Sequence, residues 1–157
     1  MRVNRYQPHV LVLPEDDRDR QLANGFLLDP GVRNIQVLGV AGGWLKALER
    51  FKSDHIRGMD DYPGRFMVLL IDFDGHPERR DEARAAIPAR LNERVFVLGV
   101  LTEPEELTFS LGSYETIGRA LAEDCRLGAG TAWEHPLLRH NEAELDRLRE
   151  RVRPILF

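Results

Sequence analysis

Four short runs of apolar residues are the feature that most constrains the fold of this chain. They lie at residues 9–13 (HVLVL), 35–40 (IQVLGV), 65–72 (RFMVLLID) and 94–100 (RVFVLGV). Each run is nearly continuous in apolar residues, which is typical of strands buried on both faces of a parallel sheet. Segments with helical spacing separate the runs. The sequence therefore predicts an α/β fold, a Rossmann-like domain with a mainly parallel central sheet flanked by helices.

Several helix boundaries can also be predicted. We expect the helix after the third run to end or kink at Pro88, because proline cannot continue a helix. We predict a further helix over residues 114–125 and a loop over residues 128–136. An amphipathic helix is expected over residues 141–152, with Asn141 as N-cap and Glu144 three residues on, close to a capping box. Its apolar stripe should pack on the domain's own core, and comprises Leu145, Leu148 and Val152.

Length and composition indicate a single domain over residues 1–157. Apolar residues make up 43% and charged residues 31% of the chain, which excludes a disordered or fibrous protein. No apolar run approaches the roughly 20 residues needed to cross a bilayer, and no signal peptide is apparent at the start, so no membrane partner is expected. Cys125 is the only cysteine, so no internal disulfide can form and a cytoplasmic location is expected.

The charge balance limits how the chain could meet nucleic acid. With 22 basic and 26 acidic residues the formal net charge is −4, which argues against an indiscriminate nucleic-acid coat protein. It does not exclude an enzyme that acts on nucleic acid, since carboxylates that hold metal ions would themselves be negative. Only Lys46 and Lys52 are lysines, so 20 basic residues are arginines. A GC-rich genome and the bidentate phosphate contacts of arginine both explain that excess.

Acidic residues follow three of the four apolar runs. They are Glu15, Asp16, Asp17 and Asp19 after the first run, Asp72 and Asp74 after the third, and Glu103, Glu105 and Glu106 after the fourth. Ligands of open α/β sheets bind at the carboxyl ends of the strands, where these residues should converge. Carboxylates crowded at one edge repel one another unless a cation neutralises them. An oxygen-only ligand set suits Mg²⁺ or Mn²⁺.

Simpler interpretations exist for some of these residues. Asp16 and Asp17 could equally be helix caps, and each glutamate after the fourth run could lie in a solvated first turn. Asp72 is the strongest candidate ligand because it directly follows VLLI, where an unpaired carboxylate would be costly. Asp74, two residues on, would face the same side in extended backbone. His76 is the histidine nearest the proposed site and a candidate substrate contact, whereas His140 is expected to be structural.

The order of these motifs resembles the Toprim domain of topoisomerases, bacterial primases and overcoming-lysogenization-defect (OLD) nucleases. Glu15 and Asp19 match a pattern like E-G-x-x-D, with Asp16 in place of the glycine. The glycine-rich turn is matched by GG at residues 42–43, and the DxD motif by residues 72–74. A later E-I-E-like segment is matched loosely by residues 103–106, where the corresponding glutamate stays open. The resemblance spans residues 9 to about 112, and the helical segment 114–157 follows it.

The resemblance implies Mg²⁺-dependent nuclease-type phosphodiester chemistry on DNA or RNA. It implies catalytic roles for Glu15, Asp72 and Asp74, and metal ligands among Glu15, Asp19, Asp72, Asp74, Glu103 and Glu106. Gly42 and Gly43, between the second run and a helix, permit close approach of a phosphate or of another strand and are the candidate substrate-binding residues of the turn. OLD nucleases usually carry an ATPase, and no GxxxxGK[ST] motif exists here. The lysine often found late in these domains is also missing, since none follows Lys52. We therefore expect a stand-alone domain. It could work beside a separately encoded ATPase in phage defence, and it could form a homo-oligomer.

Two other functions are compatible with the sequence. In a receiver-like signalling domain, the acids of LVLPEDD, Asp72 and Thr102 would be the acidic pair, the phosphoacceptor and the hydroxyl residue. That hypothesis lacks the receiver's lysine after a fifth strand and leaves DxD and EPEEL unexplained. The third hypothesis is a catalytically inactive Toprim-like module that binds nucleic acid or a protein partner.

Overall fold

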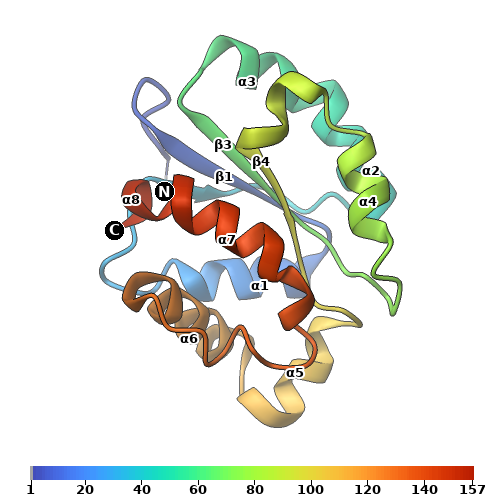
Figure 1. The fold of residues 1–157 in the computed structure, drawn as a ribbon, viewed down its shortest axis with the longest axis vertical. Helices are drawn as coiled ribbons and strands as arrows, with labels where there is room; N and C mark the ends of the chain where they lie inside the picture. The colour runs from blue at the N-terminus through green and yellow to red at the C-terminus, as the bar shows by residue number, and fades with distance from the viewer. Residues whose placement is uncertain (1) are drawn as a thin grey trace.

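The computed structural model describes residues 2–157 and contains one four-stranded sheet with helices on both faces (Figure 1). All strand pairs are parallel, and the strand order is β2-β1-β3-β4. The strands are β1 (His9–Pro14), β2 (Ile35–Val37), β3 (Arg65–Leu70) and β4 (Val95–Leu98). Each strand lies within one of the predicted apolar runs or extends it by a single residue. The predicted α/β, Rossmann-like fold with a parallel sheet is therefore confirmed.

The pairing of β1 with β3 forms the centre of the sheet. Six residue pairs link the two strands, from His9 opposite Arg65 to Pro14 opposite Leu70. Alternate residues of each strand face opposite helical layers, and every residue of β1 is buried. Burial on both sides explains why these segments are continuously apolar.

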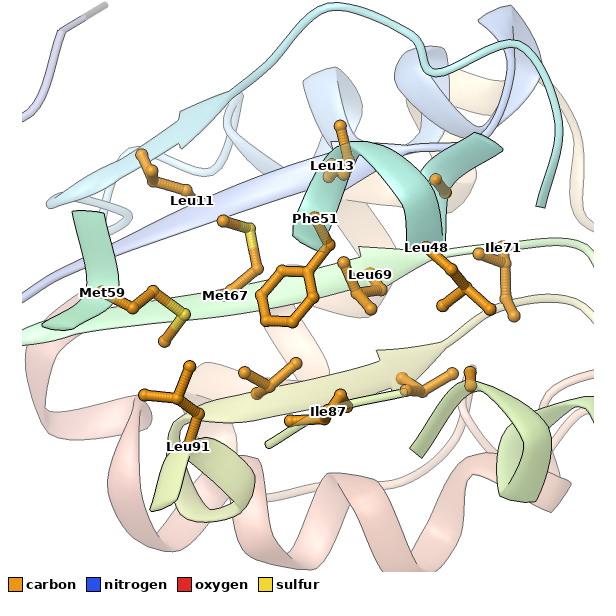
Figure 2. Close-up of a cluster of buried hydrophobic side chains, with 14 of the residues drawn as sticks. Leu11, Leu13, Leu48, Phe51, Met59, Met67, Leu69, Ile71, Ile87 and Leu91 are labelled. Atoms are coloured by element: carbon orange, nitrogen blue, oxygen red, sulfur yellow. The ribbon is translucent and has the colours of Figure 1, made fainter. Parts of the chain in front are cut away.

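One face of the sheet is covered by helices that follow β2 and β3. These are α2 (Trp44–Arg50), a π-helical turn η1 (Phe51–His55), α3 (Ile56–Asp61), α4 (Arg79–Ala85) and the 3₁₀ helix η2 (Ala89–Arg94). Figure 2 shows Phe51 over the strands, close to Leu69 and Met67. Helix α4 ends before Pro88, as predicted from the geometry of proline.

The opposite face is covered by α1 and by the end of the chain. These helices are α1 (Asp17–Phe26), the 3₁₀ turn η3 (Arg139–Asn141), α7 (Glu142–Arg151) and α8 (Arg153–Leu156). Leu145, Leu148 and Val152 are buried in one cluster with residues of β1, β3 and β4. The predicted packing of this stripe on the domain's own core is confirmed. No helix within residues 2–157 has the length and apolar character needed to cross a membrane.

Two further helices pack on the outer side of α1. They are α5 (Pro104–Leu111) and α6 (Tyr114–Leu127). Gly25 and Gly118 allow α1 and α6 to approach closely, since a Cβ added at Gly118 would lie 2.3 Å from the carbonyl oxygen of Leu22. A Cβ at Gly25 would lie 2.7 Å from the carbonyl oxygen of Glu115. The position of α1, which carries Asp19, is thus fixed from both sides.

Asn141 lies at the N-cap position of α7, as predicted, but the expected capping-box hydrogen bonds are not formed. Asn141 has helical backbone angles and makes no side-chain cap bond. Its side-chain amide instead donates to the carbonyl oxygen of Gly99 at 2.9 Å and accepts from the Gly99 amide at 3.2 Å. Glu144 accepts from the amide of Val97 at 3.1 Å. Both side chains form hydrogen bonds with the backbone of β4 and of Gly99, which follows it, because these buried amide and carbonyl groups have no partner in a neighbouring strand.

Arginines complete this arrangement at the edge of β4. Arg84 and Arg147 hold the buried Glu144 carboxylate at 2.9 Å and 3.1 Å. Arg84 Nη1 also donates to the carbonyl oxygen of Val95 at 3.2 Å. The Glu144 carboxylate is therefore buried with its charge paired.

A methyl group at the contact of α1 and α6 should destabilise the fold. We expect Gly118→Ala to lower the free energy of unfolding by about 2 kcal/mol or more, because the new Cβ would meet backbone atoms that cannot move aside. Urea denaturation followed by circular dichroism would measure the change. Gly39→Ala is the matched control, since nothing lies within 4 Å of a Cβ there. Equal stability of the two variants would contradict the close packing.

Candidate metal centre

The candidate site lies where the strand order reverses. From β1 the chain passes to β2 on one side and then crosses back to β3 on the other, so β1 and β3 flank a topological switch point. Open α/β sheets bind ligands at this position, outside the carboxyl ends of the strands. Glu15 directly follows β1, and Asp72 comes two residues after β3. The fold thus places these two carboxylates at the point where a ligand is expected.

Backbone contacts bring Glu15, Asp72 and the glycine turn together. The Glu15 amide donates to the carbonyl oxygen of Leu70 at 2.8 Å, and the Asp72 amide donates to Glu15 Oε2 at 2.6 Å. The Gly42 amide donates to the carbonyl oxygen of Glu15 at 2.8 Å. Gly42 and Gly43 have φ angles of 95° and 152°, and nothing lies within 4 Å of a Cβ at Gly43. The glycine turn therefore lies next to Glu15, and Gly43 is open where a side chain would otherwise stand.

The first turn of α1 supplies the third carboxylate. Asp16 is the N-cap, and its side chain accepts from the Asp19 amide at 3.1 Å. This turn directs Asp19 towards the sheet, where it is fully buried, and leaves Asp17 on the surface beside Arg20. The simpler interpretation of Asp16 and Asp17 as residues of the helix start thus agrees with the structure, whereas Asp19 needs another explanation.

Glu15, Asp19 and Asp72 form one acidic cluster, which we call the carboxylate triad. Each offers a carboxylate oxygen, and these oxygens all lie within 4.8 Å of one another. Both oxygens of Asp19 and Oδ1 of Asp72 are buried without a hydrogen-bond partner. Three carboxylates at this spacing could hold a metal ion. They are also costly without one, because buried charges of one sign are neither solvated nor paired.

The protonation of the triad reflects this cost. Burial, and then the charge of Asp72, raises the pKa of Asp19 well above the ordinary carboxyl range. Burial also raises the pKa of Asp72, with a smaller contribution from the charge of Glu15. The pKa of Glu15 is raised chiefly by burial. A bound cation would reverse these shifts, because it favours the charged form of each group.

Asp74 lies at the rim of the site, outside the triad. The chain leaves the extended conformation after β3, and Asp74 has a φ of 50° in a turn. Its carboxylate is exposed and lies 3.7 Å from Arg79 Nη2. Arg79 Nη1 donates to the carbonyl oxygen of Asp72 at 2.9 Å, and the guanidinium lies 4.7 Å from the ring centroid of Trp44. Sequence reasoning did not single out Arg79, because an arginine in a helix start carries no distinctive motif.

The glutamates that follow β4 are also outside the triad. Glu105 pairs with Arg18 at 3.1 Å, and Glu106 Oε2 accepts from the Thr102 hydroxyl at 2.9 Å. The pKa of Glu103 is raised, mainly by a hydrogen bond with Glu105 and then by the negative charge of Glu105. The three residues therefore form a surface acidic group at the start of α5.

Two histidines, His76 and His140, are not members of the carboxylate triad. His76 is exposed, with Nδ1 3.2 Å from Glu78 Oε1. The ring of His140 packs edge-on against Phe73, with 4.7 Å between the ring centroids. Burial, and then the charge of Arg80, lowers the pKa of His140 to about 4. His140 is thus a neutral side chain supporting the segment between Asp72 and Asp74.

Comparison with protein-family models, with curated proteins and with solved structures gives no match to this chain.

Replacing the buried carboxyl group of Asp19 should stabilise the metal-free protein. In the presence of a chelator at neutral pH, we expect Asp19→Asn to raise the free energy of unfolding by about 1–3 kcal/mol, because the wild type must take up a proton at Asp19 or bury its charge on folding, whereas the amide requires neither. Chemical denaturation would measure the change. Asp17→Asn, on the exposed side of the same helix turn, is the matched control and should lower stability, by about 1 kcal/mol or less, because it weakens the contacts of Asp17 with Arg20 and Gln21. A lower stability of Asp19→Asn would contradict an unfavourable buried carboxyl group at this position.

The triad should also make the stability of the metal-free protein pH-dependent. Because the pKa values of Asp19 and Asp72 are raised in the folded state, the unfolded chain releases these protons first. Stability then falls as pH rises above about 4, the ordinary pKa of aspartate. We expect the unfolding free energy of the wild type to fall relative to Asp19→Asn/Asp72→Asn between about pH 5 and about pH 8. Parallel pH profiles of the two proteins would contradict the shifts.

Proposed function

We propose that this protein is a metal-dependent hydrolase of phosphodiester bonds in nucleic acid, with its metal on Glu15, Asp19 and Asp72. The observation that carries the proposal is the state of Asp19, which is fully buried with both oxygens unpartnered. An acid that only capped the helix would accept hydrogen bonds from amide groups, as Asp16 does. A carboxylate aimed at two others is explained by a cation between them.

The donor set favours a hard divalent cation. All three ligand groups of the triad are carboxylates, without histidine or cysteine. Oxygen-only sites suit Mg²⁺ and Mn²⁺, and Mg²⁺ in particular keeps several waters when few protein carboxylates hold it. The lack of a side chain at Gly43 would let a phosphate approach the backbone of the turn that contacts Glu15. When bound, the metal would polarise the phosphoryl oxygen and lower the pKa of a coordinated water.

The side chains around the triad have distinct parts in this proposal. Glu15 orients Asp72 by accepting from its amide, and the Arg79 guanidinium fixes the same residue from its carbonyl side. Arg79 is only 16% exposed and stacks on Trp44, so its charge is held in place beside the exposed Asp74. It can meet a phosphate that displaces Asp74, since guanidinium and phosphate pair well. Asp74 and Glu103 at the rim are the candidates for binding a second ion.

The resemblance to Toprim domains supports the same chemistry. In the E-x-x-x-D spacing of Glu15 and Asp19, the intervening N-cap turn brings both carboxylates to one point. The first aspartate of the DxD motif joins them there. We extend the proposal to a stand-alone Toprim-like nuclease of the OLD type, acting in phage defence beside a separately encoded ATPase.

A receiver-like phosphoacceptor domain is the second candidate, favoured by the strand order. The order β2-β1-β3-β4 matches the first four strands of the flavodoxin-like arrangement that receivers share. Asp72 after β3 and Thr102 after β4 would then be the phosphoacceptor and the hydroxyl residue. This candidate gives no role to Asp19, and residues 2–157 contain neither a fifth strand nor a lysine after Lys52.

Metal-dependent cleavage tests the proposed function directly. With Mg²⁺ or Mn²⁺, we expect the wild type to cut labelled DNA or RNA, and Asp72→Asn to cut at least about a hundredfold more slowly, because a ligand of the metal is removed. Asp81→Asn, an exposed change on α4, should retain full activity. Gel analysis of the labelled strands would measure the rates.

Two outcomes would contradict hydrolysis. One is intact DNA and RNA with either metal, and the other is equal cleavage by wild type and Asp72→Asn. A gain of mass at Asp72 after incubation with a small phosphodonor would favour the receiver instead. Intact substrate together with tight binding would favour the inactive binding module.

A further inference from the structure

A groove lined by arginines lies along the sheet, away from the carboxylate triad. It has a volume of about 640 Å³ and is bordered by the N-terminal segment, by β1 and β2, and by the start of β3. Leu11 forms part of its floor, on the same sheet face as Met67 and Phe51 in Figure 2. The amide of Val3 donates to Gln36 Oε1 at 3.3 Å and so holds the N-terminal segment against β2.

The groove carries positive charge that nothing in the described chain neutralises. Arg2, Arg5 and Arg65 line it, and no acidic side chain does. Within residues 2–157, none of these arginines forms an ion pair with a carboxylate. Arg65 Nε instead donates to Nε2 of the buried His9, and its guanidinium lies 4.8 Å from the ring centroid of Tyr62, so it has no carboxylate partner. Three unpaired arginines gathered in one groove of an acidic protein favour an anionic ligand.

Two aromatic rings, those of Tyr6 and Tyr62, lie beside these charges and form what we call the aromatic platform. Tyr6 is 75% exposed, and its ring lies edge-on to that of Tyr62 with 5.9 Å between the centroids. The Arg5 guanidinium lies 5.3 Å from the Tyr6 ring centroid and 5.4 Å from that of Tyr62. Unpaired bases stack on exposed aromatic rings and guanidinium planes, whereas the bases of a duplex are already stacked. The platform therefore favours a single strand over a duplex.

The groove leads towards the carboxylate triad. It extends to Leu38, whose amide donates to the carbonyl oxygen of Val12 at 2.8 Å. The chain continues from there to the Gly42 amide, which contacts Glu15. The arginines cluster near the start of β1 and the triad lies past its end, and six residues of strand span about 20 Å. A strand bound in the groove would therefore have to continue for about 20 Å along β1 to reach the carboxylates.

We propose that this groove binds single-stranded nucleic acid. Arg2, Arg5 and Arg65 contact backbone phosphates, and a base stacks on Tyr6. The substrate class rests on the proposed function, but the groove adds a contact that needs no metal. It also explains how a protein with a net charge of −4 holds a polyanion.

Binding without metal tests the groove separately from cleavage. We would measure fluorescence anisotropy of a labelled single strand of about 16 nucleotides with Asp72→Asn protein in a chelator. Adding Arg2→Gln/Arg5→Gln should weaken binding about tenfold or more. The slope of log affinity against log salt concentration should become shallower by about 0.7 for each phosphate that the variant no longer neutralises. Both side chains are exposed, so the fold should be retained. Tyr6→Ala should weaken binding about fivefold or more.

A charge-matched control separates the groove from net charge. Arg119→Gln/Arg151→Gln removes two arginines from α6 and α7 on the opposite sheet face and should leave affinity within about twofold. Equal weakening by both double variants, unchanged binding after the groove change, or equal affinity for a duplex would overturn the inference. Groove-dependent binding without cleavage would contradict only the proposed function. Cleavage without groove-dependent binding would contradict only the groove.

Discussion

The parallel ladder between β1 and β3 is the interaction on which both the core and the candidate site depend. It joins two strands that are buried from both sides, so its hydrogen bonds form where no water competes. The ladder continues beyond the strands through the bond of the Glu15 amide to Leu70. It therefore sets the distance between the segments that carry Glu15 and Asp72. A shift of register by one residue would turn these side chains to opposite faces and dissolve the triad.

The same sheet buries acidic groups in two contrasting ways. At the edge of β4, Glu144 is enclosed by Arg84, Arg147 and a backbone amide, so its charge is satisfied within the protein. At the switch point, Asp19 has no such partner. The paired Glu144 is compatible with a stable fold, whereas the unpartnered Asp19 lowers the stability of the metal-free protein. Carboxyl groups that the fold leaves unsatisfied at a ligand-binding position mark a candidate site for a cation.

Much of the fold could be predicted from the sequence, because burial on both sheet faces leaves a direct record in continuous apolar runs. The gathering of Glu15, Asp19 and Asp72 could be anticipated from the acids that follow the strands. The position of Asp74 could not, because the turn after β3 leaves the extended conformation on which same-side placement depends. The hydrogen bonds of Asn141 with Gly99 could not be predicted from the sequence either. Its sequence context suits a helix cap, and only the tertiary fold brings the edge of β4 within its reach.

The side chains that cover β4 decide how this protein can meet other chains. Exposed edge strands offer unpaired backbone groups to which a strand of another molecule can add, and this is a common route to assembly and aggregation. Here Asn141, Glu144 and Arg84 already occupy those groups. Growth of the sheet is therefore blocked on this side and left to β2, which has three residues. Any partner of the β4 side must recognise the outer surface of α7 rather than extend the sheet.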